Sequence, residues 1–251
     1  MPKAKIAALQ AIALDDQLAE AHNSLGSYKL FFEWDTAGAE LEYRKAIALD
    51  PGYANAHHFY SHCLQFSGRG AEALREMKQA VEVEPLSAVN NAELAWAYYL
   101  DRQYDASIDQ SQKTLEMEPG FGYAYWVMGL AYNAKGMFPE ALTALEKGKT
   151  LSPDWLELQA ELAYTHASGG SPEQGRAMLA TILKTSAGGY VNEVAIASVY
   201  VALGENDKAM SWLEQGYIGR CSWMKWVSIK PKLDKLRGDP RFKDLVDRIR
   251  S

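Results

Sequence analysis

Four residues with metal-ligating or nucleophilic side chains cluster in one short stretch of the sequence: His57, His58, His62 and Cys63. His58 and His62 are four positions apart, so on a helix both imidazoles project from one face, a spacing that suits a transition metal. No third or fourth ligand is evident, because Cys63 points about a quarter turn away from this face. We therefore interpret the histidines as groove or packing residues and expect no metal. Paired histidines could instead make binding pH-sensitive under slightly acidic conditions.

The sequence contains no recognisable catalytic arrangement. Ser168, Ser198 and Ser222 lack the Gly-x-Ser-x-Gly setting of a nucleophile elbow, and Cys63 lacks a catalytic signature despite its histidine neighbours. No glycine-rich loop precedes a Lys-Ser or Lys-Thr pair, as a phosphate-binding loop requires. We expect no enzymatic activity, no catalytic residues and no cofactor.

The elements that must position these side chains follow from a repeat. Pro51, Pro85, Pro119 and Pro153 are spaced 34 residues apart, which indicates an array of stacked supersecondary units. The phase continues to Tyr190, although Ala187 stands where the preceding proline should be. The interval predicts six repeats, at residues 19–51, 54–85, 88–119, 122–153, 156–187 and 190–217.

Two places in every unit carry a small residue. The eighth place holds Gly26, Ser61, Ala95, Gly129, Ala163 and Ala197. The twentieth place holds Ala39, Ala73, Ser107, Ala141, Gly175 and Ala209. Small residues let neighbouring helices approach closely, so we predict two helices per unit. Gly148, inside a second helix, is interpreted as a further close contact.

The turn between the two helices is marked by Gly68, Gly136, Gly170 and Gly204, which tolerate the left-handed conformation that ends a helix. The proline then stops the second helix, because its ring and missing N–H oppose helix continuation. The first unit carries one extra residue, which we place within residues 31–36.

Residues 124–132 (AYWVMGLAY), Gly136 and residues 140–141 (EA) resemble the tetratricopeptide repeat motif at nearly every defining place. The third unit departs from the motif at Arg102 and Ser111, and the fifth at Pro172 and Gly175. The resemblance covers about residues 3–217. It implies an all-α, right-handed α-superhelical solenoid of helix-turn-helix units.

Both ends depart from the repeat. Residues 1–16 are expected to form the unpaired second helix of a truncated repeat, whose open face would stack on another copy or on upstream repeats. Residues 218–251 are expected to form a basic C-terminal helical cap, with helices around 228–236 and 240–249. Residues 220–251 hold ten basic and four acidic side chains, while the net charge of the whole chain is −6. The cap is interpreted as a solvated basic end, with an anion-binding surface as the alternative.

In the tetratricopeptide repeat family, certain places of the first helices usually face a concave groove. Carried onto this sequence, they give the candidate partner-binding residues His58, His62, Gln65, Trp96, Tyr99, Trp126, Asn133 and Tyr164. Aromatic side chains provide large contact areas at low entropic cost. The alternative is that Trp96 and Trp126 pack between adjacent first helices. A complete clamp for a peptide C-terminal carboxylate is absent from these places.

The leading functional hypothesis is a non-enzymatic scaffold that binds a peptide or partner helix in its groove. The alternative is an intramolecular or self-associating regulatory arm. Residues 33–35, 53–58 and 236–242 resemble the C-terminal arrays of bacterial regulators that carry a winged-helix, kinase or cyclase head. The acidic balance argues against nucleic acid as a partner of the array. Two cysteines far apart in the sequence fit a reducing, cytoplasmic location. The sequence lacks a run of about 18 apolar residues, so we expect no membrane span.

Overall fold

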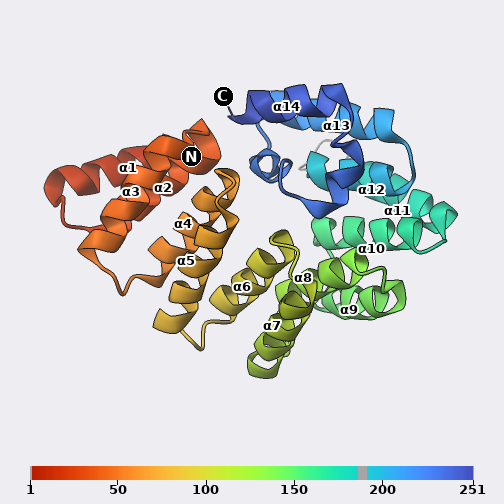
Figure 1. Ribbon diagram of the computed structural model, residues 1–251, viewed down its shortest axis with the longest axis horizontal. Coiled ribbons are helices and arrows are strands. Elements are labelled where there is room, and N and C mark those ends of the chain that lie inside the picture. Colours follow the sequence, from red (N-terminus) through yellow and green to blue (C-terminus); the bar gives the residue numbers. More distant parts are fainter. Residues whose placement is uncertain (1, 186–190, 251) are drawn as a thin grey trace. The chain divides into compact units, whose positions relative to one another are not determined.

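The computed structural model describes residues 2–185 and 191–250, and no strand occurs among them. Figure 1 shows the order of the helices. Their bounds are α1 (Pro2–Leu14), α2 (Ala19–Tyr28), η1 (Lys29–Glu33), α3 (Thr36–Leu49), α4 (Ala54–Phe66), α5 (Gly70–Val83), α6 (Ala88–Leu100), α7 (Tyr104–Met117), α8 (Gly122–Ala134), α9 (Phe138–Leu151), α10 (Leu156–Ser168), α11 (Pro172–Thr185), α12 (Glu193–Ala202), α13 (Asn206–Ile218), η2 (Ser222–Trp226), η3 (Pro231–Leu236) and α14 (Pro240–Arg250). The predicted start of the sixth repeat, Tyr190, and the missing proline at Ala187 lie outside the described residues.

The helices form two compact units, residues 1–97 and 98–251. In unit 1, α2 packs on α3 and α4 packs on α5, while α2 also contacts α4. In unit 2, the pairs are α8 with α9, α10 with α11 and α12 with α13, and α10 contacts both α8 and α12. Within each unit, therefore, consecutive helices pair and the first helices of successive pairs stack. This is the all-α, paired-helix architecture that the repeat predicts.

The small residues lie where the pattern requires close helix packing. Ala39, Ala73, Ser107, Ala141 and Ala209, at the twentieth place, have no exposed surface. At the eighth place, a Cβ on Gly129 would lie 2.5 Å from Cγ of Leu145 in the paired helix. Gly148 is also a close contact, since its Cβ would lie 2.7 Å from Cδ1 of Leu158 and 3.4 Å from the carbonyl oxygen of Gly122.

The turns confirm the predicted left-handed positions. Gly68, Gly136, Gly170 and Gly204 have φ angles of 74°, 74°, 93° and 76°. Arg102, where the third unit lacks this glycine, adopts a φ of 62° despite its side chain. The second helices α3, α5, α7 and α9 each end two residues before the repeat proline, as expected of a residue that stops a helix.

The extra residue of the first unit is absorbed by a π-helical turn, η1, which continues α2 over residues 29–33. A π turn holds one more residue than the equivalent α turn. It overlaps the predicted stretch 31–36, and Trp34, which follows it, takes the left-handed conformation with φ of 62°. The paired helix α3 then begins with Asp35 as its N-cap, whose carboxylate accepts a 2.8 Å hydrogen bond from the Gly38 N–H.

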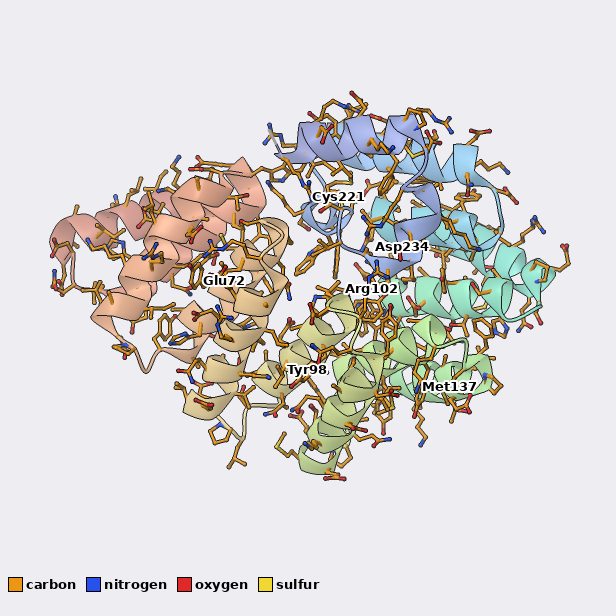
Figure 2. The ribbon with its side chains drawn as sticks, viewed as in Figure 1. Glu72, Tyr98, Arg102, Met137, Cys221 and Asp234 are labelled. Atoms are coloured by element: carbon orange, nitrogen blue, oxygen red, sulfur yellow. The ribbon has the colours of Figure 1, made fainter. Side chains whose placement is uncertain are left out.

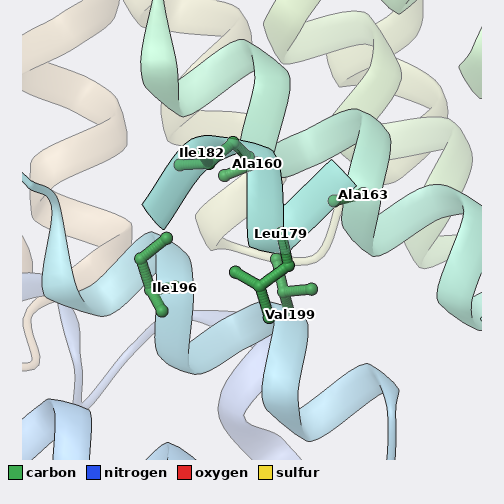
Figure 3. Close-up of a cluster of buried hydrophobic side chains, with 6 residues drawn as sticks. All are labelled: Ala160, Ala163, Leu179, Ile182, Ile196 and Val199. Carbon is green, nitrogen blue, oxygen red and sulfur yellow. The ribbon is translucent and has the colours of Figure 1, made fainter. Parts of the chain in front are cut away.

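One contact between repeats in unit 2 is a hydrophobic cluster built from α10, α11 and α12 (Figure 3). Its buried members are Ala160, Ala163, Leu179, Ile182, Ile196 and Val199. Ala163 comes from the eighth place and has no exposed surface, so the small residue brings the larger aliphatic groups together. Burial of such side chains is the main favourable free energy of a stacked array.

Gly175 of α11 provides a test of this close packing. A Cβ there would lie 2.8 Å from the carbonyl oxygen of Ala163 and 3.0 Å from Cβ of Ala167. We expect Gly175→Ala to lower the free energy of unfolding by up to about 2 kcal/mol, because overpacking costs about 1–3 kcal/mol and helix propensity returns about 1 kcal/mol. Urea unfolding measures the change. Gly238→Ala, where nothing lies within 4 Å of the added Cβ, is the control, and a stabilised Gly175→Ala protein would refute the close approach.

The C-terminal part differs in detail from the expected helices. The helix expected at 228–236 is a short 3-10 helix, η3, that begins at Pro231, whereas α14 spans Pro240–Arg250 close to the expected 240–249. Pro231 disfavours a helical conformation at the residue before it, so a helix does not continue across this position. Treating residues 218–251 as a separate cap stays a proposal.

Two surface features bear on the expectations about partners. Ile6, Leu9 and Leu14 of α1 are exposed, as is Leu18 just beyond it. Self-association through this N-terminal face stays a prediction.

None of the helices formed by the described residues combines the length and apolar character needed to cross a membrane.

Candidate functional site

The candidate groove residues lie on the first helices α4, α6, α8 and α10, and almost all of them are buried. Seven have less than a tenth of their surface exposed, and Tyr164 is half-buried. Trp96 and Trp126 are each 2% exposed, which agrees with the alternative that these indoles pack between helices. Their role in binding a partner stays a prediction. What the structure brings together is a separate polar cluster in each unit.

In unit 2 the cluster centres on Glu161, a carboxylate from α10 that is 1% exposed. Asn133 of α8 donates one hydrogen bond of 2.7 Å to Glu161 Oε1 and one of 2.8 Å to Thr165 Oγ1. The Lys232 ammonium, from η3, forms an ion pair with Glu161 Oε2. A buried carboxylate is tolerated only when such partners replace its lost hydration. The Glu161 carboxylate therefore depends on partners from two other helices, α8 and η3.

The segment of residues 222–236, here called the C-terminal segment, contacts α8 and α10 of unit 2. The Lys232 Nζ atom stands 4.8 Å from the centre of the Tyr164 ring, and the rings of Trp223 and Trp126 meet edge to face at 6.3 Å. Arg102, just after α6, donates two hydrogen bonds of 2.7 and 2.8 Å to Asp234 (Figure 2). Side chains of Arg102, Trp126, Glu161 and Tyr164 thus contact the C-terminal segment.

An aromatic wall continues this face along α8. Trp126 stacks on Tyr123 with a centroid distance of 5.5 Å and lies 5.4 Å from Trp155. Tyr99 has no exposed surface, and burial raises the pKa of its hydroxyl well above the usual value. Burial likewise raises the pKa of Tyr164 to about 12. Both phenols therefore stay protonated and apolar in character at neutral pH.

Lys230 is a second buried cation in the C-terminal segment. It is 2% exposed, and its Nζ atom lies 5.0 Å from the centre of the Trp223 ring. Burial, with the charge of Lys232 nearby, lowers the pKa of Lys230 to about 7, against the opposing effect of Glu161 and Glu157. A lysine with this pKa changes charge near neutral pH.

In unit 1 the polar cluster joins α4 to α6. His62 Nε2 lies 3.2 Å from Glu93 Oε2, and His58 Nε2 lies 3.7 Å from the same oxygen. Burial lowers the pKa of His62. Burial by itself would raise the pKa of Glu93, but the two histidines outweigh this effect and hold it well below its usual range. We infer an ionised Glu93 beside a neutral His62 at pH 7.

Neither cysteine has the environment of an activated nucleophile. Cys63 is fully buried, and its thiol donates to the carbonyl oxygen of Thr36 at 3.4 Å. Burial raises the pKa of Cys221 to about 12, so this side chain remains a thiol at neutral pH. A reactive cysteine needs the opposite shift.

With this geometry established, comparisons with known proteins place the fold. The fold is similar to that of a chain in the crystal structure of the APC/C hetero-tetramer Cut9-Hcn1, with a TM-score of 0.67 and 15% sequence identity. The match covers 99% of this chain and 46% of that chain. The structure also matches 98% of a thermophilic TPR protein of Thermus thermophilus over 74% of its length, with a TM-score of 0.64 and 18% identity. The chain therefore has the fold of a tetratricopeptide repeat array.

A curated relative agrees with this fold. Small glutamine-rich tetratricopeptide repeat-containing protein 2 of Mycosarcoma maydis is 30% identical over 115 residues, which is 46% of this chain and 33% of that protein. The tetratricopeptide repeat array thus spans about a third of the length of this relative. No protein-family model matches the chain.

The repeat numbering explains which residues the sequence reasoning missed. Glu93 and Glu161 both occupy the sixth place of their tetratricopeptide repeats, where the neighbouring units carry Phe59 and Val127. That place was not among those expected to face a partner. An acidic residue recurring at a place that is apolar in the neighbouring repeats is the signal that could have identified both carboxylates. Their partners, above all Lys232, carry no comparable signal because they lie far away in the sequence.

Proposed function

We propose that this repeat array is a non-enzymatic protein-interaction scaffold that binds an extended peptide or a partner helix on its first helices. Stacked repeats present continuous surfaces on which short segments of other proteins dock. Aromatic side chains such as Tyr164 offer contact area, and Glu161 offers a charge that sets the register of a ligand.

One observation carries this proposal: the C-terminal segment occupies the first helices of unit 2 as a ligand would. Its Lys232 ammonium meets both the Glu161 carboxylate and the Tyr164 ring, and its Trp223 ring meets Trp126. A lysine that is paired with a buried acid and an aromatic face is a specific recognition unit. The preferred partner is therefore an extended segment that carries a lysine close to an aromatic residue.

The same contact favours a second candidate, an intramolecular regulatory arm. In this version the C-terminal segment covers the first helices until a partner of similar chemistry displaces it. The two candidates share one binding chemistry, and they differ in whether a partner displaces the C-terminal segment from the first helices. We place the protein in a reducing, cytoplasmic compartment, because the sequence holds only two cysteines, Cys63 and Cys221, and they lie far apart in it.

A peptide selection tests the proposal on the full chain. Random peptides displayed on phage should become enriched in lysine next to an aromatic residue. For a selected peptide, Glu161→Gln should weaken binding at least about tenfold, or about 1.4 kcal/mol, because the amide carries no charge. Isothermal titration calorimetry measures the affinity, and circular dichroism checks that the variant folds.

A double-mutant cycle makes the result specific. Replacing the lysine of the peptide with norleucine should cost as much as Glu161→Gln, and the two changes together should cost little more than either one. The control is Glu146→Gln, since the Glu146 side chain is 55% exposed on the second helix α9. Equal affinity of the wild type and Glu161→Gln, or additive losses, would show that the peptide does not bind at this acid.

A further inference from the structure

Three side chains with metal-ligating atoms meet in unit 1: His58 and His62 of α4, and Glu93 of α6. Their ligand atoms all lie within 4.8 Å of one another. The sequence indicated no metal because only two ligands were visible on one helix face. The fold supplies the third ligand from the first helix of the next repeat. We propose that His58, His62 and Glu93 bind a divalent transition metal ion, preferably Zn²⁺.

The spacing fits a small tetrahedral site. Two ligands that each lie 2.0–2.1 Å from a tetrahedral zinc ion are about 3.3 Å apart. His62 Nε2 and His58 Nε2 lie 3.2 and 3.7 Å from Glu93 Oε2, and the two imidazole rings have centroids 4.8 Å apart. The two edges to Glu93 are therefore close to the required length, and the ligand atoms of the two imidazoles lie within 4.8 Å of each other.

His58 has an unmet need for a partner. It is 6% exposed, and neither of its ring nitrogens makes a hydrogen bond within the described part of the chain, since Nε2 lies too far from Glu93. A buried nitrogen without a partner is unfavourable, because it has lost its bonds to water. A metal ion bound by Nε2 would remove this cost.

The other buried histidines of unit 1 show what a purely structural role looks like here. His57 Nδ1 lies 2.7 Å from Glu76, and its Nε2 lies 3.1 Å from the carbonyl oxygen of Pro51. His22 repeats this arrangement with Glu42 and the carbonyl oxygen of Asp16, at 2.7 and 3.3 Å. Both nitrogens of each ring are thus occupied. His58 departs from this pattern, which is expected of a ligand rather than of a packing residue.

An aromatic shell surrounds the three ligands. Phe59 stacks on His58 with a centroid distance of 4.7 Å, and Phe31 meets His62 edge to face at 6.2 Å. Apolar surroundings limit the access of water and strengthen the attraction between a carboxylate and a cation. The Glu93 side chain remains 15% exposed, which leaves an approach for the ion and room for a fourth ligand from water or from a partner.

The ligand chemistry selects the ion. Two imidazoles and one carboxylate suit Zn²⁺ and similar transition metals, whereas Mg²⁺ and Ca²⁺ prefer sets of oxygen atoms. Because the ligands come from two successive first helices, the bound ion would link two repeats of unit 1. It would add a cross-link to a contact that is otherwise made by packing.

Zinc binding to the full chain, purified without a histidine tag and stripped with chelator, tests the site directly. We expect calorimetric titration with Zn²⁺ alone to give one ion per chain, and Mg²⁺ to give no binding. Co²⁺ should bind competitively and produce the intense visible absorption of a tetrahedral site. Zn²⁺ should also raise the thermal midpoint of the protein, because a ligand that binds only the folded state stabilises it.

Single substitutions then assign the ligands. Glu93→Gln and His58→Gln should each weaken Zn²⁺ binding at least about tenfold and abolish the cobalt spectrum. The matched control, His57→Gln, changes the neighbouring histidine on the same helix and should bind Zn²⁺ as the wild type does. Glu93→Gln preserves the size of the side chain, and circular dichroism verifies its fold. Absence of a one-to-one complex in the wild type, or equal affinity in all variants, would overturn the proposal.

Discussion

Replacing Lys232 with methionine is expected to lower the free energy of unfolding by about 3–5 kcal/mol, because it leaves the Glu161 charge buried without its cation. The Glu161 and Lys232 side chains are 1% and 8% exposed, so water cannot take over the role of the ammonium. Asn133 would remain as a hydrogen-bond donor to the carboxylate, but a neutral amide does not balance its charge. Urea unfolding followed by circular dichroism measures the loss.

A second substitution separates the effect of charge from that of lost packing. Glu161→Gln combined with Lys232→Met removes both charges, and it should recover much of the stability lost in the single variant. The control is Lys235→Met, which changes an exposed lysine of the same 3-10 helix. If Lys232→Met were as stable as the wild type, or if the double variant were no better than the single one, the buried ion pair would not be what holds the C-terminal segment.

Raising the pH from about 7 to about 8.5 is expected to stabilise unit 2 by about 1.5 kcal/mol through Lys230. Burial lowers its pKa to about 7 in the folded state, whereas the unfolded side chain titrates near its ordinary value of about 10.4. Between these two values the unfolded state binds more protons, so stability rises with pH, and the effect fades about one pH unit below the folded pKa. The charged or titratable groups that influence Lys230 are Lys232, Glu161, Glu157 and Cys221.

The contribution of Lys230 is obtained by comparison with Lys230→Met. This variant retains the apolar stem but lacks the titrating amine, so its stability should lack the extra rise over the same interval. The measurement is the free energy of unfolding at closely spaced pH values, taken as the difference between the two proteins, which cancels other titrations such as that of His57. The same difference cancels the opposing titration of Cys221, whose folded pKa is raised to about 12, whereas the unfolded thiol is half ionised near pH 8.5. Parallel pH profiles for the two proteins would contradict the prediction.

The fold was largely predictable because its determinants are local. The eighth and twentieth places are small wherever helices cross closely, as at Gly129 and Ala141. The left-handed turns fall on Gly68 and its equivalents, where only glycine adopts that conformation without strain. Even the position of the extra residue in the first unit was predicted to within a few residues, since a single insertion in a strict repeat is visible in the sequence.

The polar clusters were predictable only in part. His58, His62 and Asn133 were identified as residues of interest from their places in the repeat, but their partners were not. Glu93 and Glu161 come from a place that is apolar in neighbouring repeats. Nothing in the sequence indicates that a lysine 71 residues beyond Glu161 returns to pair with it.

The helix pairs, their turns and their stacking surfaces could be predicted from the sequence, because these depend on residue size, backbone conformation and a period of 34 residues. Which charges meet, in contrast, depends on the tertiary structure. Arg102 and Asp234 are separated by 132 residues and form a bidentate pair, and Glu93 reaches two histidines on the preceding first helix. Such pairs depend on where helices converge in space, and the free energy of each depends on burial that no local pattern specifies.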